Sequence, residues 1–191
     1  MSELGYNETR GLLVRPEYDV AFDVLEEDHR TVEECGGVVV TGQPGIGKTC
    51  FLYYLLFRRL SERRPVALEQ PDFFILFHEG GIYRYPLRAD TRYLPEGTWV
   101  LSDSNDEAPQ PCSTFKNAAK LRTVWLIQTA SPLKKRWEDW VKYCDADMFV
   151  MNHVSIEEIT ALSKIFGLDV SNVHRLYRKW GPSARTCLKL L

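Results

Sequence analysis

The sequence predicts an α/β fold with a mainly parallel five-stranded sheet, an inserted β-hairpin and a small C-terminal group of helices. Three observations predict it. Short β-branched or aromatic runs alternate with helical stretches between residues 16 and 152, which is typical of a parallel sheet covered by helices. The run at 38–41 leads into a glycine-rich loop and a long apolar helix. After residue 152 only helical periodicity remains. We therefore divide the chain into a flexible N-terminus (1–15), a core (16–152) and a C-terminal lid (153–191).

The composition narrows the class of protein. The chain has 191 residues, 45% of them hydrophobic, which is enough for one domain with a core and a small appended unit. A net charge of −2 offers no basic surface for duplex binding, so nucleic acid is not indicated as a partner. The five cysteines lack C-x-x-C spacing, which favours reduced thiols in an intracellular, cytoplasmic or nuclear protein. We find no signal-peptide pattern and no apolar run of the roughly 18 residues that span a membrane, so we expect no membrane association.

The first predicted element is a helix that starts at Pro16. Residues 1–15 contain few large apolar side chains, and we expect them to be poorly ordered. Proline suits the first turn of a helix. The apolar residues that follow share one helical face: Tyr18, Ala21, Phe22 and Leu25.

The strongest functional signal follows the strand Val38–Thr41. Gly42–Thr49, which we call the glycine loop, fits the pattern G-x-x-x-x-G-K-[ST]. A loop of this kind between a strand and a helix turns its backbone N–H groups toward phosphates, whereas the alternative is a glycine-rich turn that binds nothing. In the first interpretation Lys48 lies against the β- and γ-phosphates of ATP, and the Thr49 hydroxyl is a ligand of Mg²⁺. The predicted nucleotide contacts are Gly42, Gln43, Pro44, Gly45, Ile46, Gly47, Lys48, Thr49 and Cys50.

A short strand and a hairpin follow the helix predicted at 50–57. Val66–Glu69 is a β-rich run that begins after a proline. Two further β-rich runs, 73–78 and 82–85, flank a Gly-Gly turn. This arrangement is the signal of a hairpin.

The third predicted strand of the parallel sheet, Trp99–Asp103, ends on a carboxylate. An acid at the carboxyl end of a strand beside the glycine loop can supply the second Mg²⁺ ligand. We assign Asp103 this role, with a turn-capping aspartate as the alternative. The next residue is Ser104, where many ATPases of this kind carry a catalytic glutamate. Asp106 or Glu107 can polarise the attacking water, or both belong to a solvated loop.

The fourth strand, Thr123–Thr129, also ends in polar residues. Gln128 or Thr129 can reach the γ-phosphate or its water, and each can equally cap the strand end. Both interpretations stay open here.

A helix is predicted to start at Ser131 and Pro132, with the serine as N-cap and the proline at the first helical position. Its basic run, Lys134–Arg136, lies off the buried stripe, which favours a solvated face over an Arg136 finger acting in trans. The buried stripe consists of Trp137, Trp140, Val141 and Cys144.

Three short helices are predicted after the last strand, Asp147–Met151. Ser155-x-x-Glu158 is a capping box that starts the first helix. Ser171 and Ser183 can cap the second and the third. Helices of this kind at the end of the chain predict a lid.

The order of these elements resembles AAA+ and STAND-type ATPases over about residues 16–191. In detail the chain is similar to the Crinkler and retrotransposon-hot-spot group of P-loop NTPases in four segments: 42–53, 76–83, 129–132 and 180–185. A Gly-x-x-x-Arg element in the lid of that group resembles a sensor-2 arginine, and here it falls on Gly181 and Arg185. The resemblance implies that Arg185 reaches the γ-phosphate, whereas the alternative is a surface arginine paired with Asp169. It further implies ATP binding and hydrolysis in the regulatory or motor module of a larger effector protein.

The combined prediction is a Mg²⁺-dependent ATPase in which Lys48, Asp103 and Arg185 act on the phosphates. Thr49 and Asp103 hold the metal. A P-loop kinase is one alternative, although residues 104–111 do not clearly supply an acceptor pocket. A non-hydrolysing nucleotide switch is another, favoured by the missing glutamate after Asp103. The nucleotide is the expected ligand, and a protein partner or a homo-oligomer stays open.

Overall fold

The computed structural model describes residues 13–31 and 34–191. Residues 1–12, which make up most of the segment expected to be flexible, lie outside the described residues. The strands are β1 (Gly37–Thr41), β2 (Val66–Glu69), β3 (Phe73–His78), β4 (Gly81–Pro86), β5 (Thr98–Asp103), β6 (Val124–Thr129) and β7 (Asp147–Val150). The helices are α1 (Pro16–Thr31), α2 (Lys48–Ser61), α3 (Ser113–Lys120), α4 (Glu138–Cys144), α5 (Ile156–Ile165), α6 (Val173–Trp180) and α7 (Ala184–Leu190). Short 3₁₀ turns are η1 (Thr91–Tyr93), η2 (Lys134–Arg136) and η3 (Val170–Asn172).

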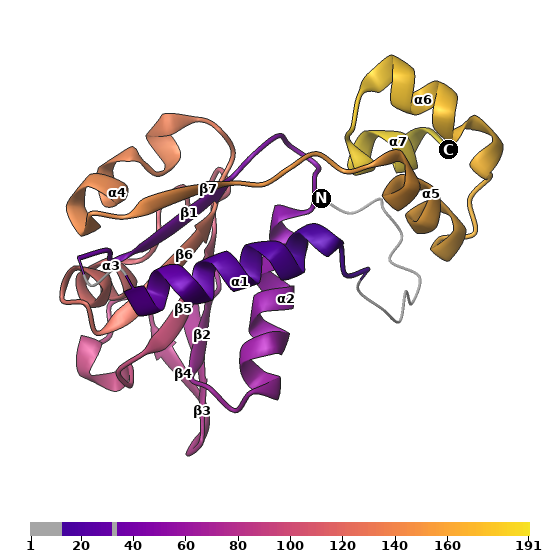
Figure 1. Cartoon of the computed structure of the whole chain (residues 1–191). Coiled ribbons are helices and arrows are strands. Elements are labelled where there is room, and N and C mark those ends of the chain that lie inside the picture. The colour runs from indigo at the N-terminus through magenta and orange to yellow at the C-terminus, as the bar shows by residue number, and fades with distance from the viewer. Residues whose placement is uncertain (1–12, 32–33) are drawn as a thin grey trace.

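The strands form one seven-stranded sheet in the order β4-β3-β2-β5-β6-β1-β7 (Figure 1). Five of them, from β2 to β7 in this order, pair in parallel. The hairpin β3-β4 continues the same sheet beyond β2 as two antiparallel strands. The predicted α/β fold with a parallel sheet and an inserted hairpin is therefore confirmed.

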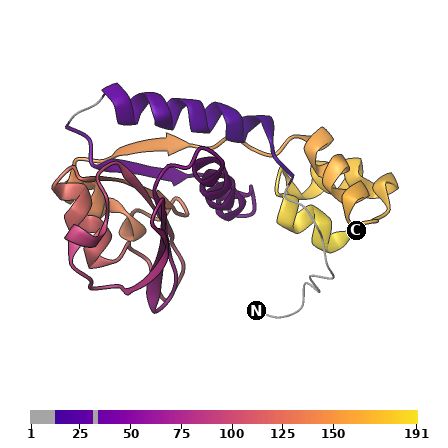
Figure 2. The ribbon, with the colours of Figure 1, turned by 90° about the horizontal axis from the view of Figure 1, so that it is seen from below.

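Helices cover both faces of the sheet, and alternate residues of each strand face opposite layers (Figures 1 and 2). Val38 and Val40 of β1 pack in a core cluster with α1 and α2, whereas Val39 packs in a second cluster with α3 and α4. Strands buried on both faces are continuous apolar runs in sequence, as β1 and β6 are.

The first core cluster continues into the C-terminal lid, which Figure 1 shows as a separate group of helices at the end of β7. Val154, in the connection from β7 to α5, is fully buried, and Tyr177 of α6 donates its hydroxyl to the Val154 carbonyl at 3.2 Å. Buried residues of the three lid helices join the same cluster: Ile159, Val173, Leu176 and Cys187. The lid is thus packed against the connection that carries it.

Two elements differ from the prediction on the second face of the sheet. Helix α3 occupies a stretch to which the sequence analysis gives no element. The start of a helix at Ser131 and Pro132 is wrong, because α4 begins at Glu138 after the η2 turn. Trp137, which is 8% exposed and has φ −146° and ψ −19°, outside the helical region, interrupts the helical backbone just before α4. The predicted apolar stripe itself is confirmed, since Trp140 and Cys144 are buried in the core.

In the lid, two of the three predicted caps are confirmed. The capping box of Ser155 and Glu158 is complete, and Ser183 accepts a hydrogen bond from the Thr186 backbone. The Ser171 cap is wrong: Ser171 donates both its backbone N–H and its hydroxyl to Asp169, which caps the η3 turn instead.

Candidate functional site

The glycine loop lies at the carboxyl end of β1, between β6 and the edge strand β7, and ligands of open α/β folds bind at the carboxyl ends of the strands. Gly45 and Gly47 have φ of 82° and 100°, in the left-handed region that favours glycine. A Cβ at Gly47 would lie 2.4 Å from the Tyr18 hydroxyl, and one at Gly45 would lie 2.7 Å from the Ser183 hydroxyl. The positive φ at both positions, together with side chains of α1 and the lid that lie close to the loop, therefore favours glycine there.

The first turn of α2 starts directly from the loop at Lys48. Its N-cap, Gly47, provides no side-chain hydrogen bond, so the amides of this first turn remain available to an anion. Lys48 Nζ donates to the carbonyls of Gly42 and Gln43 at 2.7 and 2.8 Å. Burial lowers the pKa of Lys48 to about 8; Asp103 opposes this shift and Arg185 adds to it. A bound anion would favour the charged lysine, because opposite charge raises the pKa of an ammonium group.

Asp103 at the end of β5 meets the start of α2. Its Oδ2 accepts a hydrogen bond from the Thr49 hydroxyl at 2.8 Å, and its Oδ1 accepts one from the Thr129 hydroxyl at the end of β6. A carboxylate and a hydroxyl at this distance are oxygen donors of the kind that Mg²⁺ prefers. Among the described residues no group of three or more His, Cys, Asp or Glu converges.

The loop after β5 carries Ser104 directly after Asp103 and two further acids, Asp106 and Glu107. Ser104 donates its hydroxyl to the Pro109 carbonyl at 2.9 Å. Asp106 forms an ion pair with Arg136, which holds both side chains to each other in this structure. The Arg136 side chain is only 15% exposed, and the expectation of a wholly solvated basic face is therefore wrong at this residue. Glu107 is exposed, and its backbone N–H donates to Asn105 in a turn.

The two polar residues at the end of β6 face opposite sides of the sheet. Gln128 is fully buried, donates to the Pro109 carbonyl at 2.9 Å, and accepts from the Trp140 indole at 2.6 Å. These bonds give it a structural role beneath the loop. Thr129 is the residue that lies beside Asp103.

Glu69 is a buried carboxyl that the sequence analysis missed. It ends β2 on the face that carries α3, and its Oε1 accepts the Cys112 backbone N–H at the start of α3, at 3.0 Å. Burial raises the pKa of Glu69 to about 7, against the opposing effects of hydrogen bonds and Lys116. Its Oε2 has no hydrogen-bond partner among the described residues. Glu69 therefore supports the start of α3 and is placed away from the α2 face on which Asp103 lies.

The lid touches the glycine loop through the start of α7. The Arg185 backbone N–H points to the Gly45 carbonyl at 3.5 Å, and the Arg185 side chain is exposed. Asp169, the alternative partner, is bonded to Ser171. The described residues contain no ion pair between Asp169 and Arg185, so Asp169 is not its partner in this structure, and the alternative of an exposed surface arginine stays open.

Arg15 and Tyr18 contact the loop from the other side, and neither was assigned to the site. Arg15 Nη1 donates to the Ile46 carbonyl at 2.9 Å, and the Tyr18 hydroxyl donates to the Gly47 carbonyl at 2.8 Å. Arg15 is 4% exposed, so the folded part of the chain includes a residue that the sequence analysis placed in the flexible N-terminus. No local pattern marks Arg15, while Tyr18 is predicted only as a core residue.

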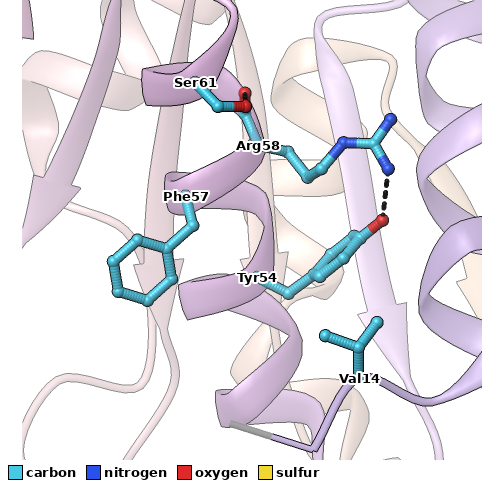
Figure 3. A pocket seen from close by; sticks show the side chains of 5 residues that line it. All are labelled: Val14, Tyr54, Phe57, Arg58 and Ser61. Atoms are coloured by element: carbon cyan, nitrogen blue, oxygen red, sulfur yellow. Dashed lines mark hydrogen bonds between the residues drawn. The ribbon is translucent and has the colours of Figure 1, made fainter. Parts of the chain in front are cut away.

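A shallow pocket lies apart from this site, on the outer side of α2 (Figure 3). Its lining contains no residue of the glycine loop. Phe57 is 59% exposed there, and Arg58 donates to the Tyr54 hydroxyl at 2.7 Å. The lining residues are Val14, Tyr54, Phe57, Arg58 and Ser61.

No family model matches the chain. Crinkler effector proteins 15 and 16 of Phytophthora infestans are each 27% identical to it over 140 residues, or 67% of this chain. The chain spans only 20% of the length of these relatives.

Solved structures with the same arrangement of elements cover nearly the whole chain. The RuvB Holliday junction branch migration motor of Thermotoga maritima matches 93% of this chain and 60% of its own, with a TM-score of 0.54 and 9% identity. AMPPCP-bound DnaA of Aquifex aeolicus matches 93% of this chain and 62% of its own, with a TM-score of 0.51 and 13% identity. The ORC1 protein of Aeropyrum pernix, in complex with DNA, matches 94% of this chain and 59% of its own, with a TM-score of 0.54 and 15% identity.

At such identities the likeness concerns the fold. The chain has the α/β fold of these structures, which are AAA+ P-loop ATPases. No helix in residues 13–31 or 34–191 is long and apolar enough to cross a membrane.

Proposed function

We propose that this chain is a Mg²⁺-dependent ATP-binding domain that hydrolyses ATP. The observation that carries the proposal is the 2.8 Å hydrogen bond from Thr49, on the first turn of α2, to Asp103, at the end of β5. It joins the two predicted metal ligands across 54 positions of sequence at the mouth of the glycine loop. The AAA+ fold of the chain supports the same role.

In the proposed complex the backbone amides of the glycine loop and of Cys50 bind the phosphates, and Lys48 holds their β- and γ-oxygens. Thr49 and Asp103 hold Mg²⁺, which supplies positive charge against the phosphates when bound. Arg185 reaches from the lid to the γ-phosphate. Thr129 orients Asp103 through its hydroxyl.

Slow turnover follows from the residues beside Asp103. Ser104 carries a hydroxyl bonded to the Pro109 carbonyl, and the nearest loop acid, Asp106, is paired with Arg136. Glu107, the other acid of this loop, is exposed, and its backbone N–H is held in the Asn105 turn. The same residues favour a second candidate function, a nucleotide switch that binds ATP without turnover.

The biological setting belongs to the proposal as well. Similarity to two Crinkler effector proteins, over a fifth of their length, supports a nucleotide-dependent regulatory module within a larger intracellular effector protein. Such a module would act on a protein partner or on a second copy of the chain.

An ADP-release assay with purified protein and Mg-ATP separates the candidates. ADP release without any added acceptor supports the ATPase. Release only in the presence of a small-molecule acceptor identifies a kinase, and tight nucleotide binding without release identifies the switch. Absence of binding, measured by isothermal titration, contradicts the proposed function altogether.

A further inference from the structure

Arg15 connects three parts of the molecule through one guanidinium group. It contacts the glycine loop at the Ile46 carbonyl, at 2.9 Å. It contacts the connection between β7 and α5 at the carbonyls of His153 and Asn152, at 3.0 and 3.4 Å. It contacts the lid through Glu158, with 2.9 Å between Arg15 Nε and Glu158 Oε1. A planar group with five donors can hold all these acceptors at once, which a lysine cannot do.

The partner carboxylate is itself fixed to the start of α5. Glu158 Oε2 accepts the Ser155 backbone N–H at 2.7 Å, within the capping box of that helix. The side chains of Arg15 and Glu158 are 5% and 16% exposed, so solvent screens their attraction only weakly. The position of Arg15 is therefore transmitted directly to the first turn of the lid.

On the loop side, Arg15 and Tyr18 fix the direction of two consecutive peptide groups. In a trans peptide the C=O and the following N–H point in opposite directions. Arg15 holds the Ile46 carbonyl and Tyr18 holds the Gly47 carbonyl. The N–H groups of Gly47 and Lys48 consequently point away from α1, which is the orientation in which successive amides form an anion-binding concavity.

We propose that Arg15 is a positioning residue that couples the phosphate-binding conformation of the glycine loop to the seating of the lid. The proposal rests on the proposed nucleotide binding. Phosphates that order the loop amides also fix the Ile46 carbonyl, and through Arg15 and Glu158 they fix α5. Because such coupling is reciprocal, a seated lid strengthens phosphate binding by the same factor.

The test compares variants that cut the connection on either side of Arg15. Affinity for a non-hydrolysable ATP analogue with Mg²⁺ is measured by isothermal titration, and hydrogen exchange of lid amides at 156–190 is measured without nucleotide and at saturation. In the wild type we expect bound nucleotide to slow exchange in the lid. Arg15→Gln should weaken binding on the order of tenfold, the equivalent of one charge-assisted hydrogen bond. It should also abolish the protection of the lid at saturation.

Two milder variants separate the two halves of the connection. Glu158→Gln leaves the loop contacts of Arg15 in place, so lid protection should be lost with a smaller loss of affinity. Tyr18→Phe removes only a hydroxyl at the loop, so affinity should fall while lid protection at saturation persists. Arg30→Gln, at an exposed arginine of α1, is the control, and it should change neither the nucleotide affinity nor the lid protection.

If Arg15→Gln fails to fold, nucleotide affinity and lid protection are compared between the wild type, Glu158→Gln and Tyr18→Phe, and the outcomes are still distinct. If the Arg15 or the Glu158 variant binds nucleotide with the affinity of the wild type and shows the same lid protection, the coupling is overturned and the proposed function is left intact. Rescue of lid protection by Arg15→Lys also overturns it, since a lysine retains the charge without the bridging geometry. Failure of the wild type to bind nucleotide overturns the proposed function and the coupling together.

Discussion

At the scale of single residues, Asp103 is the point where three elements meet. It accepts hydrogen bonds from Thr49 of α2 and from Thr129 of β6 while ending β5 itself. The sequence predicts this position because an acid that follows a buried strand must lie at the same sheet edge as the glycine loop. Its role as a metal ligand stays a prediction.

We predict that Asp103→Asn retains nucleotide binding and loses hydrolysis. The amide oxygen still accepts a hydrogen bond from one threonine and the amide nitrogen can donate to the hydroxyl of the other, but the side chain lacks the charge that stabilises Mg²⁺ and the transition state. Isothermal titration should show nucleotide affinity within about tenfold of the wild type, and ADP release should fall by roughly 100-fold or more, as for loss of a principal electrostatic contact. Unchanged ADP release would mean that the metal ligand lies on another strand end.

Glu69→Gln provides a pH-dependent prediction at the residue scale. The folded-state pKa of Glu69 is raised from 4.5 to about 7, so its contribution to stability is present at low pH and is lost as pH rises through 7. The variant cannot ionise and still offers an oxygen to the Cys112 N–H. It should therefore be more stable than the wild type at about pH 8.5, by on the order of 1–3 kcal/mol, and nearly equal at about pH 5.

Chemical denaturation of both proteins at these two pH values measures the difference directly. Other titrating groups, Lys48 among them, are common to both proteins and cancel in the comparison. A stability difference that is the same at both pH values would show that Glu69 ionises normally in the folded protein.

The residues that sequence reasoning missed share a physical cause. A glycine loop is a local pattern, and each of its residues can be recognised from its neighbours. Arg15 instead acts through Glu158, 143 positions away, and Glu69 acts through Cys112, 43 positions away. Arg15 carries no local signal. Glu69 ends a predicted strand, as Asp103 does, but only the fold brings it to Cys112 and buries it.

At the scale of secondary-structure elements, hydrophobic periodicity predicts correctly which helix face is buried, whereas local start signals predict poorly where a helix begins. The four residues expected on the buried face of the first helix are the four that α1 buries. The start of α4 was misplaced because a serine-proline pair also fits an extended connection, and packing of Trp137 decides between the two. Tertiary contact thus overrides a local start signal.

Arg185→Ala tests the role of the lid helix α7. Arg185 lies in the first turn of α7, where the macrodipole disfavours a cation by several tenths of a kcal/mol, and its backbone already lies beside Gly45 of the loop. An anion at the loop would compensate for that placement. We therefore expect the variant to bind a non-hydrolysable ATP analogue about tenfold more weakly, the value of one charge-assisted contact, with ADP affinity nearly unchanged. Isothermal titration with both nucleotides measures this ratio, and an unchanged ratio would make Arg185 a surface residue.

At the scale of the whole molecule, the parallel order of strands explains why the candidate site is compact. β1, β5 and β6 are neighbours in the sheet, so their carboxyl ends bring the glycine loop, Asp103 and Thr129 to one edge. The first core cluster joins α1 and α2 to the lid, which places α7 on the loop. The fold class could be predicted from the sequence because the alternation of strands with helices and the glycine-rich pattern indicate the same fold. The contacts between the lid and the glycine loop depend on three-dimensional packing and could not.

Nucleotide binding at the glycine loop is the central claim, and thermal unfolding with and without Mg-ATP tests it most directly. At about 100 times Kd, a ligand stabilises the folded state by roughly 2.7 kcal/mol. For a chain of this size that is a rise in Tm of about 5–11 °C. Lys48→Ala should remove most of the rise, because it deletes the cation placed against the phosphates, whereas Lys142→Ala, at an exposed lysine paired with Glu138, should retain it. A wild-type rise below about 1 °C at millimolar Mg-ATP, or an equal rise in the Lys48 variant, would contradict the account.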